Sequence, residues 1–261
     1  MDLGLENKVA LVAGSSKGLG FATAKVLLEE GAYVVINGRT MESLKEAENL
    51  LGKSKRISSF PCDVTKSHDC EALIQHTTDK FGNLDILITN SGGPKAGDFE
   101  DLTDEDWEDA IAKSLKSHIY LFQRGIPLLK KSKCPSILTI TSFTVKQPLP
   151  GMVLSNSVRA ATAALTKSLS KELGKYRIRV NSILPGWTYT DRVNDLINTR
   201  SQLKGVSIEA ETKSITDSIP LGRLGNADEF ARTAAFLVSP AASFINGVMI
   251  NVDGGLYQGL F

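Results

Sequence analysis

Three glycines with a spacing suited to binding a phosphate follow a short apolar run near the N-terminus. Gly14, Gly18 and Gly20 are spaced G-x-x-x-G-x-G, and a segment of helical period, Phe21 to Glu30, comes directly after them. Glycine lets backbone N–H groups approach a phosphate closely, and a helix N-terminus adds a partial positive charge. A strand before this turn and a helix after it predict a dinucleotide site rather than a plain glycine-rich connection. The expected cofactor contacts are Gly14, Ser16, Lys17, Gly18, Leu19 and Gly20.

The residues after the second apolar run indicate which dinucleotide binds. NAD sites commonly place Asp or Glu there to bind the ribose 2′-hydroxyl, whereas this chain has Asn37-Gly38-Arg39. Arg39 can pair with a 2′-phosphate through two parallel hydrogen bonds, and Lys17 supplies a second cation nearby. We therefore predict NADP(H) in preference to NAD(H); a solvated Arg39 and a simple turn Lys17 are the alternative.

Further motifs extend this pattern along the chain. Ala13 to Gly20, Asp63-Val64, Thr89 to Gly92 and Asn181 to Gly186 each follow an apolar run. They resemble the T-G-x-x-x-G-x-G, D-V, N-N-A-G and N-x-x-x-P-G motifs of the short-chain dehydrogenase/reductase family, particularly its 3-oxoacyl-carrier-protein reductase-like members. From this resemblance we expect further cofactor contacts from Asp63, Val64, Asn90, Gly92, Arg159, Pro185, Gly186, Thr188 and Thr190.

The catalytic positions depart from that family. The resemblance implies a Ser, a Tyr and a Lys, the last two spaced Y-x-x-x-K, together with an Asn. No Tyr in the chain is followed by Lys four residues later. Alignment on residues 165–169 places Ser155 and Arg159 at the Tyr and Lys positions, with Ser142 thirteen residues before Ser155. We therefore predict Ser142, Ser155 and Arg159 as catalytic residues, with Ser114 at the Asn position.

These replacements change the available chemistry. Arg159 can bind ribose hydroxyls and present a fixed positive charge, but it does not act as an acid near neutral pH. A Ser hydroxyl titrates far above the tyrosine value of about 10, so Ser155 needs a water or a ribose hydroxyl to relay a proton. Lys146 and Tyr189 are alternative donors. A register one residue earlier puts apolar side chains at the Tyr and Lys positions. The other alternative is that Ser155 and Arg159 lie on a solvated helix surface and have no part in catalysis.

The resemblance implies an oxidoreductase that transfers a hydride between NAD(P)H and a carbonyl or alcohol. Together with Lys17 and Arg39 and with the changed catalytic positions, it leads us to predict an NADP(H)-dependent enzyme with a non-standard proton donor. It also implies a small-molecule substrate, 3-oxoacyl-like among the possibilities, and a homo-oligomer, either a tetramer or a dimer. The alternative is a dinucleotide-binding regulator or scaffold without dehydrogenase turnover. A third possibility is a dehydration or isomerisation, because a fold alone does not fix a reaction.

The elements that must position these residues follow a βαβ rhythm. Short apolar runs rich in β-branched residues alternate with segments of helical period, which predicts an α/β fold with one Rossmann-type, doubly wound parallel sheet flanked by helices. We expect one domain over 1–261. The polar, weakly helical segment 188–225 breaks the rhythm and is predicted to be a substrate lid, with Trp187 as an apolar wall and Arg192 as a candidate anchor. The predicted strands are 8–13, 32–37, 55–60, 84–89, 135–141, 177–183 and 247–251, and the predicted helices are 18–30, 40–51, 66–81, 103–130, 152–174 and 226–238.

Composition limits the partners. The 261 residues carry 30 Lys and Arg against 29 Asp and Glu, so a net charge of +1 does not favour nucleic acid or an anionic membrane. Three cysteines make no even framework, which favours a reduced compartment, and the N-terminus has no secretory core, so we expect a cytoplasmic protein. The spacing of Cys62, His68, Cys70 and His76 matches no zinc pattern, and we expect no metal.

Overall fold

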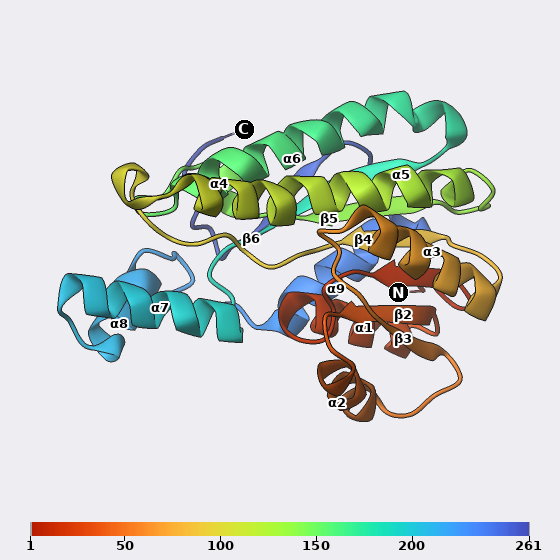
Figure 1. The fold of residues 1–261 in the computed structure, drawn as a ribbon, viewed down its shortest axis with the longest axis horizontal. Helices are drawn as coiled ribbons and strands as arrows, with labels where there is room; N and C mark the ends of the chain where they lie inside the picture. The colour runs from red at the N-terminus through yellow and green to blue at the C-terminus, as the bar shows by residue number, and fades with distance from the viewer. Residues whose placement is uncertain (1, 261) are drawn as a thin grey trace.

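One parallel sheet organises the computed structural model, which describes residues 2–260. Within that range seven strands pair in the order β3-β2-β1-β4-β5-β6-β7 (Figure 1). The order reverses between β1 and β4, so a crevice is expected at the carboxyl ends of these strands. The predicted α/β, doubly wound sheet is confirmed. The strands are β1 Val9–Val12, β2 Tyr33–Gly38, β3 Ile57–Pro61, β4 Ile86–Thr89, β5 Ser136–Ile140, β6 Arg179–Pro185 and β7 Met249–Val252.

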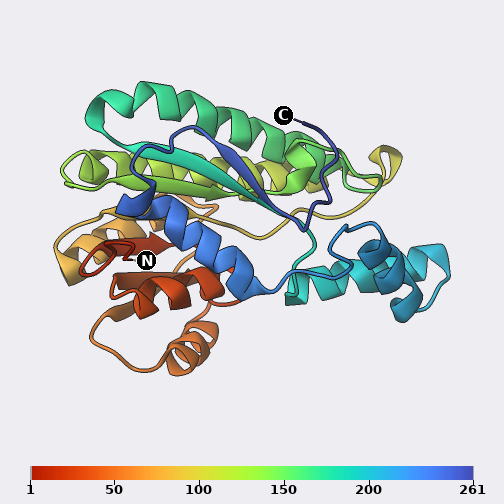
Figure 2. The same cartoon turned by 180° about the vertical axis from the view of Figure 1, so that it is seen from behind.

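The central strands are apolar on both faces because helices cover both sides of the sheet. In β1, Ala10 and Val12 belong to a core with α1 and α9, whereas Leu11 between them packs on the opposite side against α3 and α5. Figure 2 shows α1 and α9 side by side on one face of the sheet. The bounds of these helices are α1 Gly18–Glu29, α3 Ser67–Phe81, α5 Ser117–Leu129 and α9 Ala227–Val238.

The other expected helices form α2 Met41–Leu51 and α6 Val153–Glu172. The helix predicted near 103–130 is confirmed as continuous helical structure from Asp104 to Leu129, but it is not one regular α-helix. Helix α4, Asp104–Ile111, is joined to α5 by a π-helical turn, Ala112–Lys116. The hydroxyls of Ser91 and Ser117 donate to the carbonyl of Lys113 at this turn. Side chains thus provide hydrogen bonds to a carbonyl that would accept from a backbone N–H group in a regular helix. No helix among residues 2–260 has the length and apolar character needed to cross a membrane.

The segment 188–225 is more helical than its sequence pattern predicts. It contains α7, Asp191–Lys204, and α8, Ile208–Asp217, which lie together beyond the helices that flank the sheet (Figure 1). Thr190 caps α7 by accepting a hydrogen bond from the N–H of Val193, and Ser207 caps α8 in the same way. Capping and the packing of Ile197 with Ile215 stabilise helices that the weak apolar periodicity does not reveal.

Candidate active site

A cavity of about 730 Å³ lies at the carboxyl ends of β1, β4, β5 and β6. It brings together the glycine-rich turn, the loops after β4 and β5, the N-terminal part of α6 and the beginning of α7. The predicted residues that line it are Gly14, Ser16, Lys17, Gly18, Leu19, Arg39, Asp63, Val64, Asn90, Gly92, Ser142, Ser155, Arg159, Pro185, Gly186, Thr188 and Thr190. Gly20 lies behind the turn and does not line the cavity: a Cβ atom there would collide with the carbonyl oxygen of Gly14.

The glycine-rich turn leaves backbone donors available to an anion. Helix α1 has no side-chain cap and no acidic residue in its first turn, unlike α7 and α8, so no carboxylate competes for its N–H groups. Gly14 has φ +57°, a conformation that favours glycine. The amide of Asn90 donates to the Gly14 carbonyl at 2.9 Å, and the side-chain oxygen of Asn37 accepts from the Gly14 N–H at 3.1 Å. These bonds fix a turn whose donors suit a pyrophosphate.

Two exposed cations stand beside this turn. Lys17 forms an ion pair of 3.0 Å with Asp191 at the start of α7, whereas Arg39 has no ion pair among residues 2–260. Asn37, at the end of β2, is buried and donates to the carbonyls of Phe60 and Cys62. Its role is therefore structural, and it does not replace a ribose-binding carboxylate. The free guanidinium of Arg39 and the absence of that carboxylate fit a 2′-phosphate better than a 2′-hydroxyl.

Three hydroxyl groups form a chain on the opposite wall. The Thr144 hydroxyl donates to Ser142 Oγ at 3.0 Å, and the Thr144 N–H donates to the same oxygen at 3.2 Å. Thr144 Oγ1 lies 3.2 Å from Ser155 Oγ, and because its own proton is given to Ser142, Ser155 is the donor of that pair. Ser142 thus accepts two hydrogen bonds and keeps its own proton for a group in the cavity.

Arg159 follows Ser155 by one helical turn and points into the same cavity. Its guanidinium donates to the carbonyl oxygen of Thr141, immediately before Ser142. Burial, together with the positive charge of Arg192, lowers the pKa of Arg159 to about 10, so the group remains protonated at neutral pH. The neighbouring imidazole of His118 is buried, and burial together with Arg159 lowers its pKa to about 3; His118 is therefore neutral. Arg159 supplies a fixed positive charge beside the hydroxyl chain.

The alternative proton donors lie elsewhere. The ammonium group of Lys146 donates to the carbonyl of Met249 at 3.1 Å and lies 5.3 Å from the ring centre of Tyr257. Tyr189 is 54% exposed, and neither Lys146 nor Tyr189 lines the cavity. Ser114 is buried in the π-helical turn and does not line the cavity either; its carbonyl accepts from the hydroxyl of Thr162. These three candidates from the sequence are not brought to the site.

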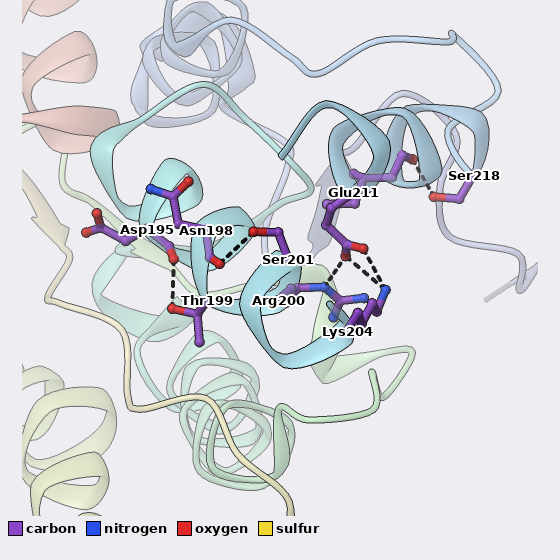
Figure 3. A network of polar contacts seen from close by, with 9 residues as sticks. Asp195, Asn198, Thr199, Arg200, Ser201, Lys204, Glu211 and Ser218 are labelled. Atoms are coloured by element: carbon purple, nitrogen blue, oxygen red, sulfur yellow. Dashed lines mark hydrogen bonds and ion pairs between the residues drawn. The ribbon is translucent and has the colours of Figure 1, made fainter. Parts of the chain in front are cut away.

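The segment over the cavity is clamped by a buried carboxylate. Glu211 of α8 is 2% exposed at its side chain and accepts from Arg200 at 2.7 Å and from Lys204 at 2.8 Å, both on α7 (Figure 3). Burial alone would raise the pKa of Glu211, but the hydrogen bonds from Lys204 and Arg200 hold it below its ordinary value. Arg200 also lies 5.8 Å from the ring centre of Trp187, which lines the cavity. The clamp therefore links both helices to the cavity wall.

The apolar part of the cavity has no reactive thiol. Phe143, Leu149, Met152 and Trp187 form a wall next to the hydroxyl chain. Cys62 also lines the cavity, but burial and the nearby Cys70 raise the pKa of its thiol to about 12. Cys62 is thus a thiol and not a thiolate at neutral pH, which makes it a poor nucleophile.

Comparisons with known proteins agree with this geometry. A family model described as enoyl-(acyl carrier protein) reductase matches residues 13–257. The chain is 32% identical over 254 residues to a 3-oxoacyl-[acyl-carrier-protein] reductase of Staphylococcus epidermidis, covering 97% of this chain and 100% of that protein. The chain belongs to the short-chain dehydrogenase/reductase family. Its similarity to a 3-oxoacyl-carrier-protein reductase confirms the resemblance seen in its motifs.

Two solved structures share the complete short-chain dehydrogenase/reductase fold. An L-sorbose reductase from Gluconobacter frateurii, complexed with NADPH and L-sorbose, has a TM-score of 0.93 and 29% identity, with 100% of both chains covered. An NADPH-bound short-chain oxidoreductase from Pseudomonas aeruginosa PAO1, whose catalytic centre is described as atypical, has a TM-score of 0.87 and 30% identity, with 97% of this chain and 99% of that chain covered.

Sequence reasoning missed Thr144 and Asn37 in this short-chain dehydrogenase/reductase. Thr144 joins Ser142 to Ser155, and its position two residues after Ser142 in a loop was the available signal, because Ser and Thr hydroxyls bind locally in such turns. The sequence pattern marks Asn37 only as the place where a ribose-binding carboxylate is missing. In the structure it connects the glycine-rich turn with the loop after β3. Its role depends on contacts between strands that spacing along the chain does not show.

Proposed function

We propose that this short-chain dehydrogenase/reductase is an NADP(H)-dependent oxidoreductase that interconverts a carbonyl and its alcohol. The observation that carries the proposal is that an uncapped phosphate turn and the Ser142 hydroxyl chain line one continuous cavity. When bound, NADP(H) supplies or accepts the hydride. The solved relatives that contain NADPH support this choice of cofactor.

The cofactor end of the cavity is assigned from its donors. The N–H groups at the start of α1 bind the pyrophosphate, and Arg39 and Lys17 bind the 2′-phosphate as charge-assisted donors. Asp63 receives two hydrogen bonds from Thr65, at 3.0 and 2.8 Å, which orient its carboxylate beside the adenine region. Thr190 lies over the turn, with its Cγ2 atom 3.6 Å from the Cβ position of Gly18, and closes the site from the side of α7.

At the end of the cavity where the carbonyl would react, the hydroxyl chain takes the place of the tyrosine that the family resemblance implies. Ser142 donates its free proton to the substrate oxygen, which gains negative charge during reduction. The proton that leaves Ser142 is replaced from Thr144, and that of Thr144 from Ser155, while water restores the proton of Ser155. Arg159 stabilises the negative charge that passes along this chain, since it remains protonated throughout.

The segment 188–225 serves as the substrate lid in this proposal. Trp187, Val193 and Leu196 present apolar surface to the cavity, and the Glu211 clamp holds the two lid helices together. Exclusion of water by such a lid strengthens hydrogen bonds to the reacting oxygen.

Turnover and binding measured together test the function. Calorimetry is expected to show NADPH binding tighter than NADH, and carbonyl-dependent oxidation of NADPH is expected in a panel that contains 3-oxoacyl thioesters, sugars and oxo acids. Binding of NADPH without oxidation by any carbonyl would refute the oxidoreductase assignment and favour a cofactor-responsive regulator. Oxidation that is unaffected by Ser142→Ala would refute the proton path alone.

A further inference from the structure

The cavity contains two guanidinium groups that converge on one point. Gly93, in the loop after β4, lies between them: a Cβ atom there would sit 3.1 Å from Arg192 Nε and 3.5 Å from Arg159 Nη2. Arg159 comes from α6 and Arg192 from the first turn of α7, so the two groups approach from the floor of the cavity and from the segment above it. Like charges repel each other, and the positive charge of Arg192 adds to burial in lowering the pKa of Arg159.

The surrounding protein does not neutralise this pair. Each guanidinium donates to a single backbone carbonyl, Arg159 to Thr141 and Arg192 to Pro94, although a guanidinium has five N–H donors. Neither forms an ion pair within residues 2–260. Burial lowers the pKa of Arg192; the carboxylate of Asp195, one turn further along α7, opposes that shift but forms no ion pair with Arg192.

The other carboxylates that line the cavity are already engaged. Asp191 pairs with Lys17 at 3.0 Å, and Asp109 pairs with Lys113 at 2.7 Å. Asp63 accepts from Thr65 and lies on the side of Arg39, where the 2′-phosphate is assigned. Within residues 2–260, no carboxylate forms an ion pair with either guanidinium at Gly93, and the pyrophosphate has its own donors at the start of α1.

We propose that the substrate carries a carboxylate, which binds between Arg159 and Arg192. A carboxylate has four lone-pair directions and accepts parallel hydrogen bonds from a guanidinium, so it matches both the charge and the unused donors. Arg159 lies one helical turn from Ser155, and its partner carbonyl precedes Ser142, so the anion sits beside the hydroxyl chain with the carbonyl a short distance away. Because Arg192 belongs to α7, the anion also holds the lid against the body of the protein.

This inference rests on the proposed function, and it names the substrate class as oxo acids. The test uses acetoacetate, 4-oxopentanoate and 5-oxohexanoate, each beside its methyl ester, with NADPH as reductant. For at least one chain length, we expect kcat/KM for the acid to exceed that for the ester by about 100-fold, the size expected for one charge-assisted hydrogen-bond pair. In Arg192→Met the ratio should fall to near one, and Arg192→Lys should restore part of it.

A matched control and a binding assay separate the two hypotheses. Arg232→Met removes an exposed arginine of α9 outside the cavity and should keep the acid-to-ester ratio. Calorimetry with the same acids and NADP⁺-saturated protein should show binding that Arg192→Met abolishes, even if no oxo acid is reduced. The carboxylate site is overturned if kcat/KM is equal for acid and ester at every chain length and no binding of the acids is measurable. NADPH turnover on neutral carbonyls in that case leaves the oxidoreductase assignment intact.

Discussion

At the scale of single residues, the site depends on hydroxyl groups where the family resemblance implies a phenol. The hydroxyl and the N–H of Thr144 both donate to Ser142 Oγ. The hydroxyl proton of Ser142 is therefore left to point toward a group in the cavity. A serine is a weak acid, so in the proposed mechanism this arrangement donates a hydrogen bond to developing charge and relays a proton. Arg159 completes the set with a charge that does not titrate near neutral pH.

Ser142→Ala is expected to lower kcat by about 10²- to 10³-fold with little change in NADPH affinity, because removing one preorganised donor to an oxyanion has that effect. Thr144→Val should lower kcat less, since Ser142 keeps its proton but loses its relay. Ser157→Ala, an exposed hydroxyl on α6 that binds the carbonyl of Val153, is the control and should change neither value. Steady-state kinetics with calorimetric NADPH binding checks all three variants.

Arg39→Ala should weaken NADPH binding by about 10- to 100-fold and leave NADH binding nearly unchanged, because the proposal assigns the guanidinium to the 2′-phosphate alone. Calorimetric titration of both cofactors measures the two affinities. Equal losses for NADPH and NADH would contradict the assignment of Arg39 to the 2′-phosphate.

At the scale of elements, the sequence pattern located the strands well because β-branched apolar runs and the glycine-rich turn are local signals. The helix predicted over 103–130 is present, but its pattern does not reveal the π-helical turn, which depends on the hydroxyls of Ser91 and Ser117 that donate to the carbonyl of Lys113. Helix α8 was also hidden, because its stability comes from the Ser207 cap and the Glu211 clamp. The contacts of Thr144 and Arg192 join separate segments, so spacing along the chain could not reveal them.

Glu211→Gln is expected to lower the free energy of unfolding by about 1–3 kcal/mol at neutral pH, since it removes charge from hydrogen bonds to two cations. Asp217→Asn, which affects an exposed ion pair with Lys213 on the same helix, should cost less than about 1 kcal/mol. Denaturant unfolding measures both variants, and equal effects would show that the clamp adds nothing to the stability of the lid.

The same clamp predicts a pH dependence. The folded pKa of Glu211 lies below its ordinary value of 4.5, so its contribution is present above pH 4.5 and is lost as the pH falls through the folded pKa. The stability difference between the wild-type protein and Glu211→Gln should therefore shrink in acid. A difference that grows as the pH is lowered would contradict this electrostatic account.

At the scale of the whole molecule, the doubly wound sheet brings the carboxyl ends of β1, β4, β5 and β6 to one edge, and residues of α7 line the cavity there. A ligand that binds only the folded protein stabilises it by mass action, by about 2.7 kcal/mol at a hundredfold excess over Kd. NADPH should therefore raise Tm more than NADH at equal concentration, and Arg39→Ala should remove the difference. Identical shifts by both cofactors in the wild-type protein would contradict the preference for NADP(H).

Transfer of label from the cofactor tests the central claim most directly. NADPH carrying deuterium at C4 is incubated with a reducible carbonyl, and the alcohol product is analysed by mass spectrometry. The oxidoreductase assignment predicts deuterium on the new carbinol carbon, formed about 10²- to 10³-fold more slowly in Ser142→Ala. A product without deuterium, or no product from protein that binds NADPH, would contradict it.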